Sequence, residues 1–508
     1  MAGPPGLGRV VDVRAQQSRD RSRFWVVYGA LLTLVLITAV IAASTAPQAF
    51  SIAFLVLILA SAACFLRPTA GIYVIVFLTL IGDTVTTSWW PFTKNMSSRE
   101  SIFFVHDSIP INPLEILLVL TTISWLLRSL DDPTWKFRRG ALFTPLIVFT
   151  GFVLLAVGRA FASGADKRVA FFEARPLLYM IAVYFLVTNL FETRQQYIRL
   201  VMLALTAVSI QSIFSLNFYL TLTPSERAEL ESLSEHSATV LMDMLFLLLL
   251  AVVMLKCSRY LRWSLLFLSI PVVWAYLLSQ RRAAMVALFV GVVFLVVVLF
   301  FRRRRAFWFF TPAAVVVGLG FVLATWNAKG PIGLPSTAVK TVLFPDELAE
   351  ADRNSDIYRQ LEAFDIWFTI RNNPVQGVGF GQKFQQPAPL PDLSFFEFWE
   401  YIPHNSVLWI WIKLGFLGFA SMLFLFARAV QLGARSAIAV RKADHVAMVV
   451  GGVGYVVMFI VFAYVDIAWD VRSTVYLGIG FAMCSDFARA RDAPPVHVGP
   501  AHYEMVPQ

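Results

Sequence analysis

The side chains best suited to chemistry lie in and around a long polar segment, residues 327–403, which ends at His404 in the run PHNSVLWIWIKLGFLGF. Two pairs of arginines accompany it: Arg353 and Arg359 within the segment, and Arg281 and Arg282 in a tight turn between two apolar runs. An imidazole exchanges a proton near neutral pH, and guanidinium groups bind phosphate oxygens in pairs. These residues predict a site for an anionic ligand, with the chemistry placed at His404.

The rest of the chain has the composition of a membrane protein. Of its 508 residues, 58% are hydrophobic and 15% are charged, and the mean hydropathy is +0.70. Crossing a bilayer takes about 20 mostly apolar residues. Fourteen segments are candidates: 24–45, 48–66, 70–88, 113–130, 141–160, 177–190, 196–219, 238–255, 263–280, 283–301, 306–326, 404–427, 446–465 and 472–487. The sixth is short, and it could tilt or start earlier. We therefore predict an all-α, polytopic membrane protein with about 12 to 14 transmembrane helices, in which 327–403 forms one large outer loop containing short helices.

The basic residues predict the orientation of these spans, because lysine and arginine gather in short cytoplasmic loops. Clusters fall on one side of the predicted topology: Arg9 to Arg23, Lys136 to Arg139, Lys256 to Arg262, Arg302 to Arg305, Arg428 to Lys442, and Arg489 with Arg491. Both termini are then cytoplasmic. The net charge of +10 is explained by topology and anionic membrane lipid, so no nucleic-acid partner is predicted.

The domain organisation follows from these spans. We expect a disordered cytoplasmic tail at 1–23, a transmembrane bundle of about 11 spans at 24–326, the extracytoplasmic loop at 327–403, further transmembrane helices at 404–487 and a second tail at 488–508. The first apolar segment is too long for a signal peptide and should be retained. The three cysteines, Cys64, Cys257 and Cys484, lie near cytoplasmic span ends, so neither a disulfide nor a cysteine metal site is expected.

Several arginines lie on predicted outer connections, against the tendency of basic residues to gather on the cytoplasmic side. Besides the two pairs named above, Arg175 precedes the sixth span in FFEARPLLY. It could bind a phosphate or pair with Glu173, and any single outer arginine could instead reach lipid headgroups. Lys413 should lie about 13 Å into the membrane, nine residues after His404. Its predicted role is a structural ion pair with Asp243, Glu115 or Asp83.

The outer loop contains one clear helical pattern, DRNSDIYRQLEAFDIWFTIRNNP, from Asp352 to Pro374. Its apolar residues recur at helical spacing, which predicts an amphipathic helix with Arg359 on the face away from Leu361. The following GVGFG, residues 377–381, lacks the preceding strand of a nucleotide-binding fingerprint and predicts a turn. The aromatic and proline-rich stretch after it suits a lid, a sugar-stacking surface or an interfacial belt.

Four motifs in order resemble the O-antigen ligase and polymerase superfamily of bacterial integral membrane glycosyltransferases. They are SQRRAAMVALFVG around Arg282, IYRQLEAFDIW around Arg359, NPVQGVGFG, and PHNSVLWIWIKLGFLG beginning just before His404. The likeness extends over about residues 170 to 470. The His-Asn-Ser element, His404 to Ser406, followed by Gly415 and Gly418, is its most specific part.

The resemblance implies a GT-C-type enzyme that moves a glycan from a polyprenyl diphosphate carrier, such as undecaprenyl diphosphate, to a hydroxyl on the outer face of the inner membrane. His404 would be the catalytic base, since an ordinary imidazole is mostly neutral at pH 7. Arg282 and Arg359 would bind the diphosphate, with Arg281 and Arg175 as further candidates and Asn405 and Arg353 in support. A structural role for His404 at the start of the next helix is the alternative.

The partners implied are the lipid-linked glycan donor, a glycan, lipid or protein acceptor, membrane lipid and other polysaccharide-assembly proteins. No cofactor or metal is expected, because the outer segments lack a dense cluster of Asp, Glu and His. A polymerase and a ligase would share the same donor chemistry, so the sequence does not distinguish between them. A flippase for lipid-linked oligosaccharides and a noncatalytic assembly scaffold are the rival interpretations. A flippase needs a polar path between both faces, whereas the unusual residues here gather on one side.

Overall fold

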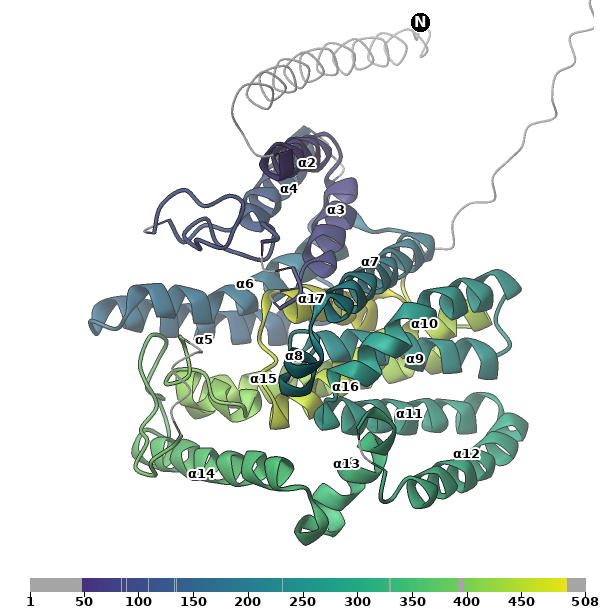
Figure 1. The fold of residues 1–508 in the computed structure, drawn as a ribbon. Helices are drawn as coiled ribbons and strands as arrows, with labels where there is room; N and C mark the ends of the chain where they lie inside the picture. The colour runs from purple at the N-terminus through teal and green to yellow at the C-terminus, as the bar shows by residue number, and fades with distance from the viewer. Residues whose placement is uncertain are drawn as a thin grey trace, which may run out of the picture.

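The computed structural model describes residues 48–490, apart from 84, 88, 108, 132, 134, 231, 329 and 392–396. The predicted first span at 24–45, the tail at 1–23 and residues 491–508 of the second tail lie outside the described residues. The described part of the chain folds into helices and their connections, with no β-strand (Figure 1). This confirms the predicted all-α class.

Helices follow one another along the chain much as the hydropathy pattern predicts. The first group is α2 (Gln48–Leu66), α3 (Pro68–Ile81), α4 (Pro113–Asp131), α5 (Phe143–Ala162), α6 (Lys167–Leu190), α7 (Arg194–Thr221) and the short α8 (Pro224–Glu229). The second is α9 (Ala238–Met254), α10 (Arg259–Ser279), α11 (Arg282–Arg302) and α12 (Arg304–Ala324). The last helices of the described residues are α15 (Ser406–Ala439), α16 (Ala443–Val465) and α17 (Val471–Asp486).

Within the described ranges, nine helices are long and apolar enough to cross a membrane: α4, α5, α6, α7, α10, α11, α12, α15 and α16. The helices α2, α3 and α9 are apolar but shorter. The structure is thus that of a polytopic membrane protein. Each predicted span that falls on described residues coincides with one of these helices or with α17.

Three spans differ from the prediction by seven residues or more at one end. Helix α3 ends at Ile81, seven residues before the predicted end of the 70–88 span. Helix α6 begins at Lys167, ten residues before the predicted start, because Asp166 caps it by accepting hydrogen bonds from the backbone N–H groups of Arg168 and Val169. Arg175 therefore lies within a helix and not on a connection. Helix α15 continues to Ala439 and has a break at Gly415, where φ is +74° and ψ −179°.

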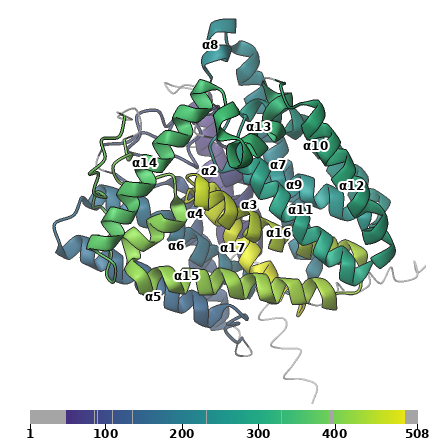
Figure 2. The ribbon, with the colours of Figure 1, turned by 90° about the horizontal axis from the view of Figure 1, so that it is seen from below.

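The core is built around the last two helices. Helix α17 packs against α6, α15, α16 and α3, while α16 also packs against α9 and α11 (Figure 2). Glycines permit the closest of these approaches. A Cβ on Gly478 of α17 would lie 2.6 Å from the carbonyl oxygen of Met180 on α6. Helix α12, by contrast, lies at the periphery and has no buried residue.

The predicted loop between α12 and α15 is itself mostly helical. It contains α13 (Leu334–Leu343), two 3₁₀ turns (Pro331–Gly333 and Pro345–Glu347) and the long α14 (Glu350–Asn372). The predicted amphipathic helix is confirmed, with α14 beginning two residues before the expected range. The helix packs on the first turns of α15, and it brings its polar side chains to the end of the bundle where α15 begins.

Candidate functional site

His404 precedes the first turn of α15, whose start is capped by Asn405. The Asn405 side-chain oxygen accepts a hydrogen bond from the backbone N–H of Leu408 at 2.9 Å. Glu362, which faces His404 from α14, accepts a hydrogen bond from the His404 backbone N–H at 3.0 Å, and its other oxygen lies 3.1 Å from His404 Nδ1. The carboxylate is buried. Since Nδ1 is engaged by Glu362, Nε2 is the nitrogen that can exchange a proton with a ligand.

The surroundings of His404 raise its pKa above the ordinary imidazole value. Burial lowers the pKa of His404, but the hydrogen bond and negative charge of Glu362, together with the charge of Asp466, outweigh burial and the opposing charge of Arg359. Tyr358 lies edge-on to the imidazole with ring centroids 5.5 Å apart. A larger share of His404 is therefore protonated at neutral pH than the sequence alone indicates.

A second histidine–carboxylate pair lies beside the first. Asp466, at the end of α16, has Oδ1 2.7 Å from Nδ1 of His236, which precedes α9. The two imidazole rings have their centroids 6.4 Å apart. Arg281 approaches the other oxygen of Asp466 at 3.8 Å. Burial raises the pKa of Asp466, but His236, Arg281 and His404 outweigh it and hold this pKa well below its usual range. We call Glu362, His404, His236, Asp466 and Arg281 the His404 cluster.

Arg282 and Arg359 are brought together by one carboxylate, that of Asp356 on α14. The two terminal nitrogens of Arg282 lie 3.1 and 3.3 Å from the Asp356 oxygens. Arg282 also donates to the Thr341 hydroxyl at 2.7 Å, and Arg359 lies 3.9 Å from Asp356. We call these four residues the Asp356 network. It adjoins the His404 cluster, because Arg359 and Glu362 lie one turn apart on α14.

The adjacent arginines Arg281 and Arg282 point to different carboxylates. Gln280 ends α10 in the left-handed conformation, with φ of +50°, and Arg282 begins α11. Arg281 contacts Asp466 and the Ser232 hydroxyl, whereas Arg282 contacts α13 and α14. Arg281 therefore belongs to the His404 cluster, and Arg282 belongs to the Asp356 network.

Arg175 and Arg353 are placed differently. Arg175 is buried, pairs with Glu115 at 2.8 Å, and has its guanidinium carbon 4.6 Å from the centroid of the Phe171 ring. It also donates to Asn95, so its partner is Glu115 and not Glu173. Arg353 is exposed and donates to the carbonyl of Asp346. None of these contacts is with the His404 cluster.

The position of His236 is fixed by a further buried ion pair. Arg472 of α17 lies 2.8 Å from Asp83 and 3.4 Å from Glu235, the residue before His236. The backbone N–H of Glu235 donates to Asp83 at 3.1 Å. Three segments far apart in the sequence are thus joined directly behind the second imidazole.

The predicted ion pair of Lys413 is formed with Glu173, not with Asp243, Glu115 or Asp83. Both side chains are fully buried, 2.8 Å apart. The pair also holds the glycine-rich turn, because Lys413 donates to the carbonyl of Gln382 at 2.6 Å and the Gly381 N–H donates to Glu173 at 2.7 Å. The sequence suggested wrong partners because α6 was expected to begin after Glu173.

The GVGFG segment forms a tight turn against the break in α15. Gly377, Gly379 and Gly381 all have positive φ, at 67°, 93° and 68°. A Cβ on Gly377 would lie 2.4 Å from the carbonyl oxygen of Ile412, so a side chain is excluded there on two grounds. The prediction of a turn in place of a nucleotide-binding loop is confirmed.

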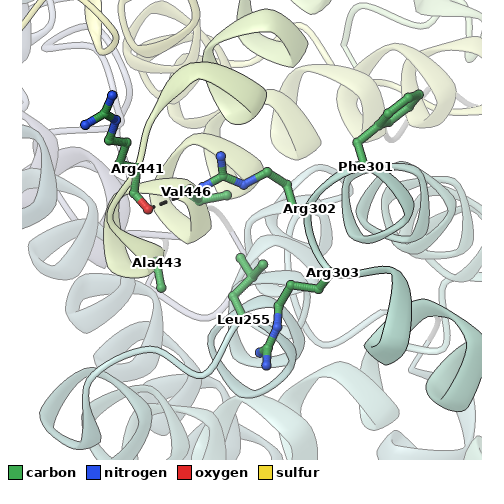
Figure 3. A pocket seen from close by; sticks show the side chains of 7 residues that line it. All are labelled: Leu255, Phe301, Arg302, Arg303, Arg441, Ala443 and Val446. Atoms are coloured by element: carbon green, nitrogen blue, oxygen red, sulfur yellow. Dashed lines mark hydrogen bonds between the residues drawn. The ribbon is translucent and has the colours of Figure 1, made fainter.

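A pocket of about 340 Å³ lies at the opposite end of the bundle, where α11 ends and α16 begins (Figure 3). Arg302 donates to the carbonyls of Ile438 and Val440 at 2.8 and 2.6 Å, and Arg303 donates to that of Met254. Figure 3 shows the guanidinium of Arg441 turned away from the other two. Arg302 and Arg303 satisfy helix-end carbonyls, and the three guanidinium groups do not converge on a common ligand.

The described part of the chain also contains no candidate metal site. Within it, no three His, Cys, Asp or Glu side chains are arranged to hold an ion. Cys64, Cys257 and Cys484 are buried free thiols.

The fold and this site define a class, namely a helical, polytopic membrane protein with histidines and arginines gathered at one end of its bundle. Residues 267–423 match the family model described as O-antigen ligase. The matched segment includes Arg281, Arg282, Arg359, Glu362 and His404. It is shorter than the range of about 170 to 470 over which the motifs suggested a likeness.

One curated relative extends the comparison. The chain is 31% identical over 112 residues to the O-antigen ligase of Salmonella typhimurium strain LT2, a stretch that covers 20% of this chain and 27% of the relative. The chain thus matches about a quarter of that protein's length.

Proposed function

We propose that this protein is a metal-independent, GT-C-type glycosyltransferase that moves a glycan from a polyprenyl diphosphate carrier to a hydroxyl acceptor. The observation that supports this most directly is the contact between His404 and Glu362 next to the paired arginines Arg282 and Arg359. A proton acceptor and a cationic binding surface are the two elements that such a transfer needs. The match of residues 267–423 to the O-antigen ligase family model supports the same assignment.

In the proposed reaction, the acceptor hydroxyl oxygen attacks the anomeric carbon of the donor sugar. The bond from that carbon to the diphosphate oxygen breaks, and the leaving diphosphate takes the electron pair. His404 Nε2 accepts the hydroxyl proton, and the negative charge of Glu362 stabilises the imidazolium that results. Arg282 and Arg359 bind the diphosphate as its charge develops, in competition with Asp356, which contacts both in the free protein.

The reacting groups are proposed to face the outside of the inner membrane. The opposite end of α11 carries Arg302 to Arg305, and such clusters favour the cytoplasmic side. The donor glycan would then meet its acceptor on the outer face, with both termini of the chain in the cytoplasm. The acceptor class, whether glycan, lipid or protein, is not specified by the site.

The decisive experiment is glycan transfer by the purified protein reconstituted in lipid, with a polyprenyl diphosphate glycan as donor and a chelator present. We expect wild-type protein to form product and His404→Ala to lose about two to four orders of magnitude in rate. Arg353→Ala is the matched control, since Arg353 is exposed and donates to the backbone carbonyl of Asp346. Loss of activity in chelator with recovery in magnesium or manganese would refute metal independence.

Retained activity in His404→Ala would refute the role of the imidazole. Absence of product from folded wild-type protein, with glycan, lipid and protein acceptors all tried, would favour transport of lipid-linked oligosaccharide instead. That alternative requires a polar route through the bundle. The buried charges of Lys413 and Glu173 do not provide one, because they are paired with each other.

A further inference from the structure

Helix α14 has its apolar side facing outward. Its large apolar side chains remain exposed in the folded chain: Ile357 (46%), Leu361 (36%), Phe364 (57%), Trp367 (45%) and Phe368 (38%). These residues recur every three or four positions and therefore form one stripe. We call them the α14 stripe. In water, such a row of exposed aromatic and aliphatic groups would be strongly unfavourable.

The opposite face of α14 is buried, and it carries polar side chains beside Ile366 and Ile370. Glu362, Asp365 and Thr369 are all covered by the rest of the protein. Asp365 accepts a hydrogen bond from the backbone N–H of Ala388 at 2.9 Å, and Thr369 bonds the backbone of Gln385. A helix lying on a water-soluble domain would instead present polar side chains on its exposed face. The arrangement of α14 is the one expected where the surroundings of the exposed face are apolar.

The stripe is continuous with the lipid-facing surface of α15. Trp367 packs edge-on against Trp411 with ring centroids 6.0 Å apart, and Trp411 stacks on Phe419 at 4.9 Å. Phe416 and Leu417, at the next turn of α15, are exposed. Since α15 is one of the helices that can cross the membrane, its exposed apolar side chains contact lipid, and the α14 stripe extends that surface.

The break in α15 indicates the depth of this surface. From Phe416 to Ala439 the helix still has enough residues, at 1.5 Å each, to cross a hydrocarbon core of roughly 30 Å. The turn that ends α14 lies at this break, where Phe416 N–H donates to the carbonyls of Pro374 and Val375 at 3.1 Å. The break, the end of α14 and the surrounding tryptophans therefore lie near one membrane boundary, where aromatic belts are found.

The direction of α14 fits a helix lying in that boundary. Figure 2 shows α14 at the edge of the bundle, running obliquely to α15. Arg353 and Arg371, close to its two ends, are exposed. Long basic side chains at such positions can reach lipid headgroups while the aromatic rings between them remain in the acyl region.

We propose that α14 lies in the lipid interface at the His404 end of the bundle, with the α14 stripe immersed in the acyl chains of that leaflet. The occupant of this surface is the bilayer itself. The same helix then holds Glu362 and Asp356 at the depth of the headgroups. If the proposed transfer is correct, a lipid-linked diphosphate reaches His404 by lateral diffusion, without its lipid leaving the membrane.

The test measures the surroundings of single spin labels on the full-length protein in nanodiscs made of phosphatidylethanolamine and phosphatidylglycerol. Labels are placed at Leu361→Cys and Phe364→Cys in the stripe. Leu417→Cys, at an exposed position of α15 next to its break and therefore at the proposed depth of the stripe, is the lipid reference. Arg99→Cys, whose native side chain is 80% exposed, is the water reference. The native cysteines are buried, and unsubstituted protein reports their background labelling.

We expect the ratio of accessibility to oxygen over a water-soluble nickel complex at both stripe positions to lie within about twofold of that at Leu417. A ratio close to that at Arg99 would refute the proposal. Low accessibility to both reagents would also refute it, because the stripe would then be covered by protein, such as a second copy. The measurement uses no substrate, so its outcome is independent of whether transfer activity is found.

Discussion

Replacing Glu362 by glutamine tests the chemistry of His404 most directly. Glutamine retains the shape and one acceptor oxygen, but removes the negative charge that lies 3.1 Å from His404 Nδ1. A hydrogen bond to a charged group contributes about 1.5 to 3 kcal/mol, and a neutral one about 0.5 to 1.5 kcal/mol. The difference, about 1 to 1.5 kcal/mol, corresponds to about one unit in the pKa of His404.

The sign of the effect follows from the base role. The rate should rise with pH as His404 loses its proton, and the raised pKa of His404 places that rise above the ordinary imidazole range in wild-type protein. Without the charge of Glu362, the pKa of His404 falls, so the acid limb of kcat/KM against pH should move down by about one unit. The plateau at high pH should fall about tenfold, since the imidazolium formed in the transition state loses the same stabilisation.

The assay is the reconstituted transfer reaction, followed across pH in both proteins. Other charged and titratable groups near His404, namely Asp466, His236, Arg359 and Tyr358, are unchanged in this variant. Asp365→Asn is the matched control, because Asp365 is a buried carboxylate on the same helix that bonds Ala388 and not His404. An acid limb that stays in place in Glu362→Gln, or that moves equally in Asp365→Asn, would refute the reasoning.

Three further perturbations follow from the contacts described above. Lys413→Met should destabilise the protein by about 3 to 5 kcal/mol, since Glu173 is left buried without its partner. Thermal unfolding in detergent should show that adding Glu173→Gln restores part of the lost stability. A double variant no more stable than Lys413→Met would contradict the pairing. Arg282→Lys should reduce transfer at least about tenfold, because lysine lacks the planar guanidinium that can contact two oxygens of one partner. Arg353→Lys should have little effect. Equal transfer rates in the two variants would exclude a role for bidentate binding by Arg282. Gly377→Ala should lower stability by about 1 to 2 kcal/mol or more, because its φ is positive, and an unchanged melting temperature would be inconsistent with the turn described.

The helices could be predicted from the sequence because lipid imposes a simple requirement. A segment such as 283–301 must satisfy its backbone internally and present apolar side chains, and α11 begins and ends within a residue of that expectation. The start of α6 was missed for the converse reason. Its first turns carry Lys167, Arg168 and Glu173, which look like a connection when hydropathy is the criterion.

The candidate site was predicted in part. His404, Arg282 and Arg359 stand out because they are charged or titratable residues at motif positions on the predicted outer side. Glu362 and His236 give no such signal. Glu362 is one of several acidic residues on an amphipathic helix, and its contact with His404 depends on how α14 packs against α15.

Asp466 illustrates the same limit at the end of a span. A carboxylate there is ordinary, and its significance appears only when α16 places it against His236 and Arg281. Contacts between segments more than 200 residues apart, such as that between His236 and Asp466, follow from helix packing, which a single sequence does not specify.

The buried pair of Lys413 and Glu173 has a consequence for the order in which the chain is assembled. Glu173 is synthesised with α6, but its partner is 240 residues later in the sequence, on α15. During synthesis, therefore, α6 has to wait for α15 before its charge is matched. A nascent chain arrested after α14 would carry that carboxylate without its lysine, and would be a natural target for membrane quality-control proteases or a client for an insertion chaperone.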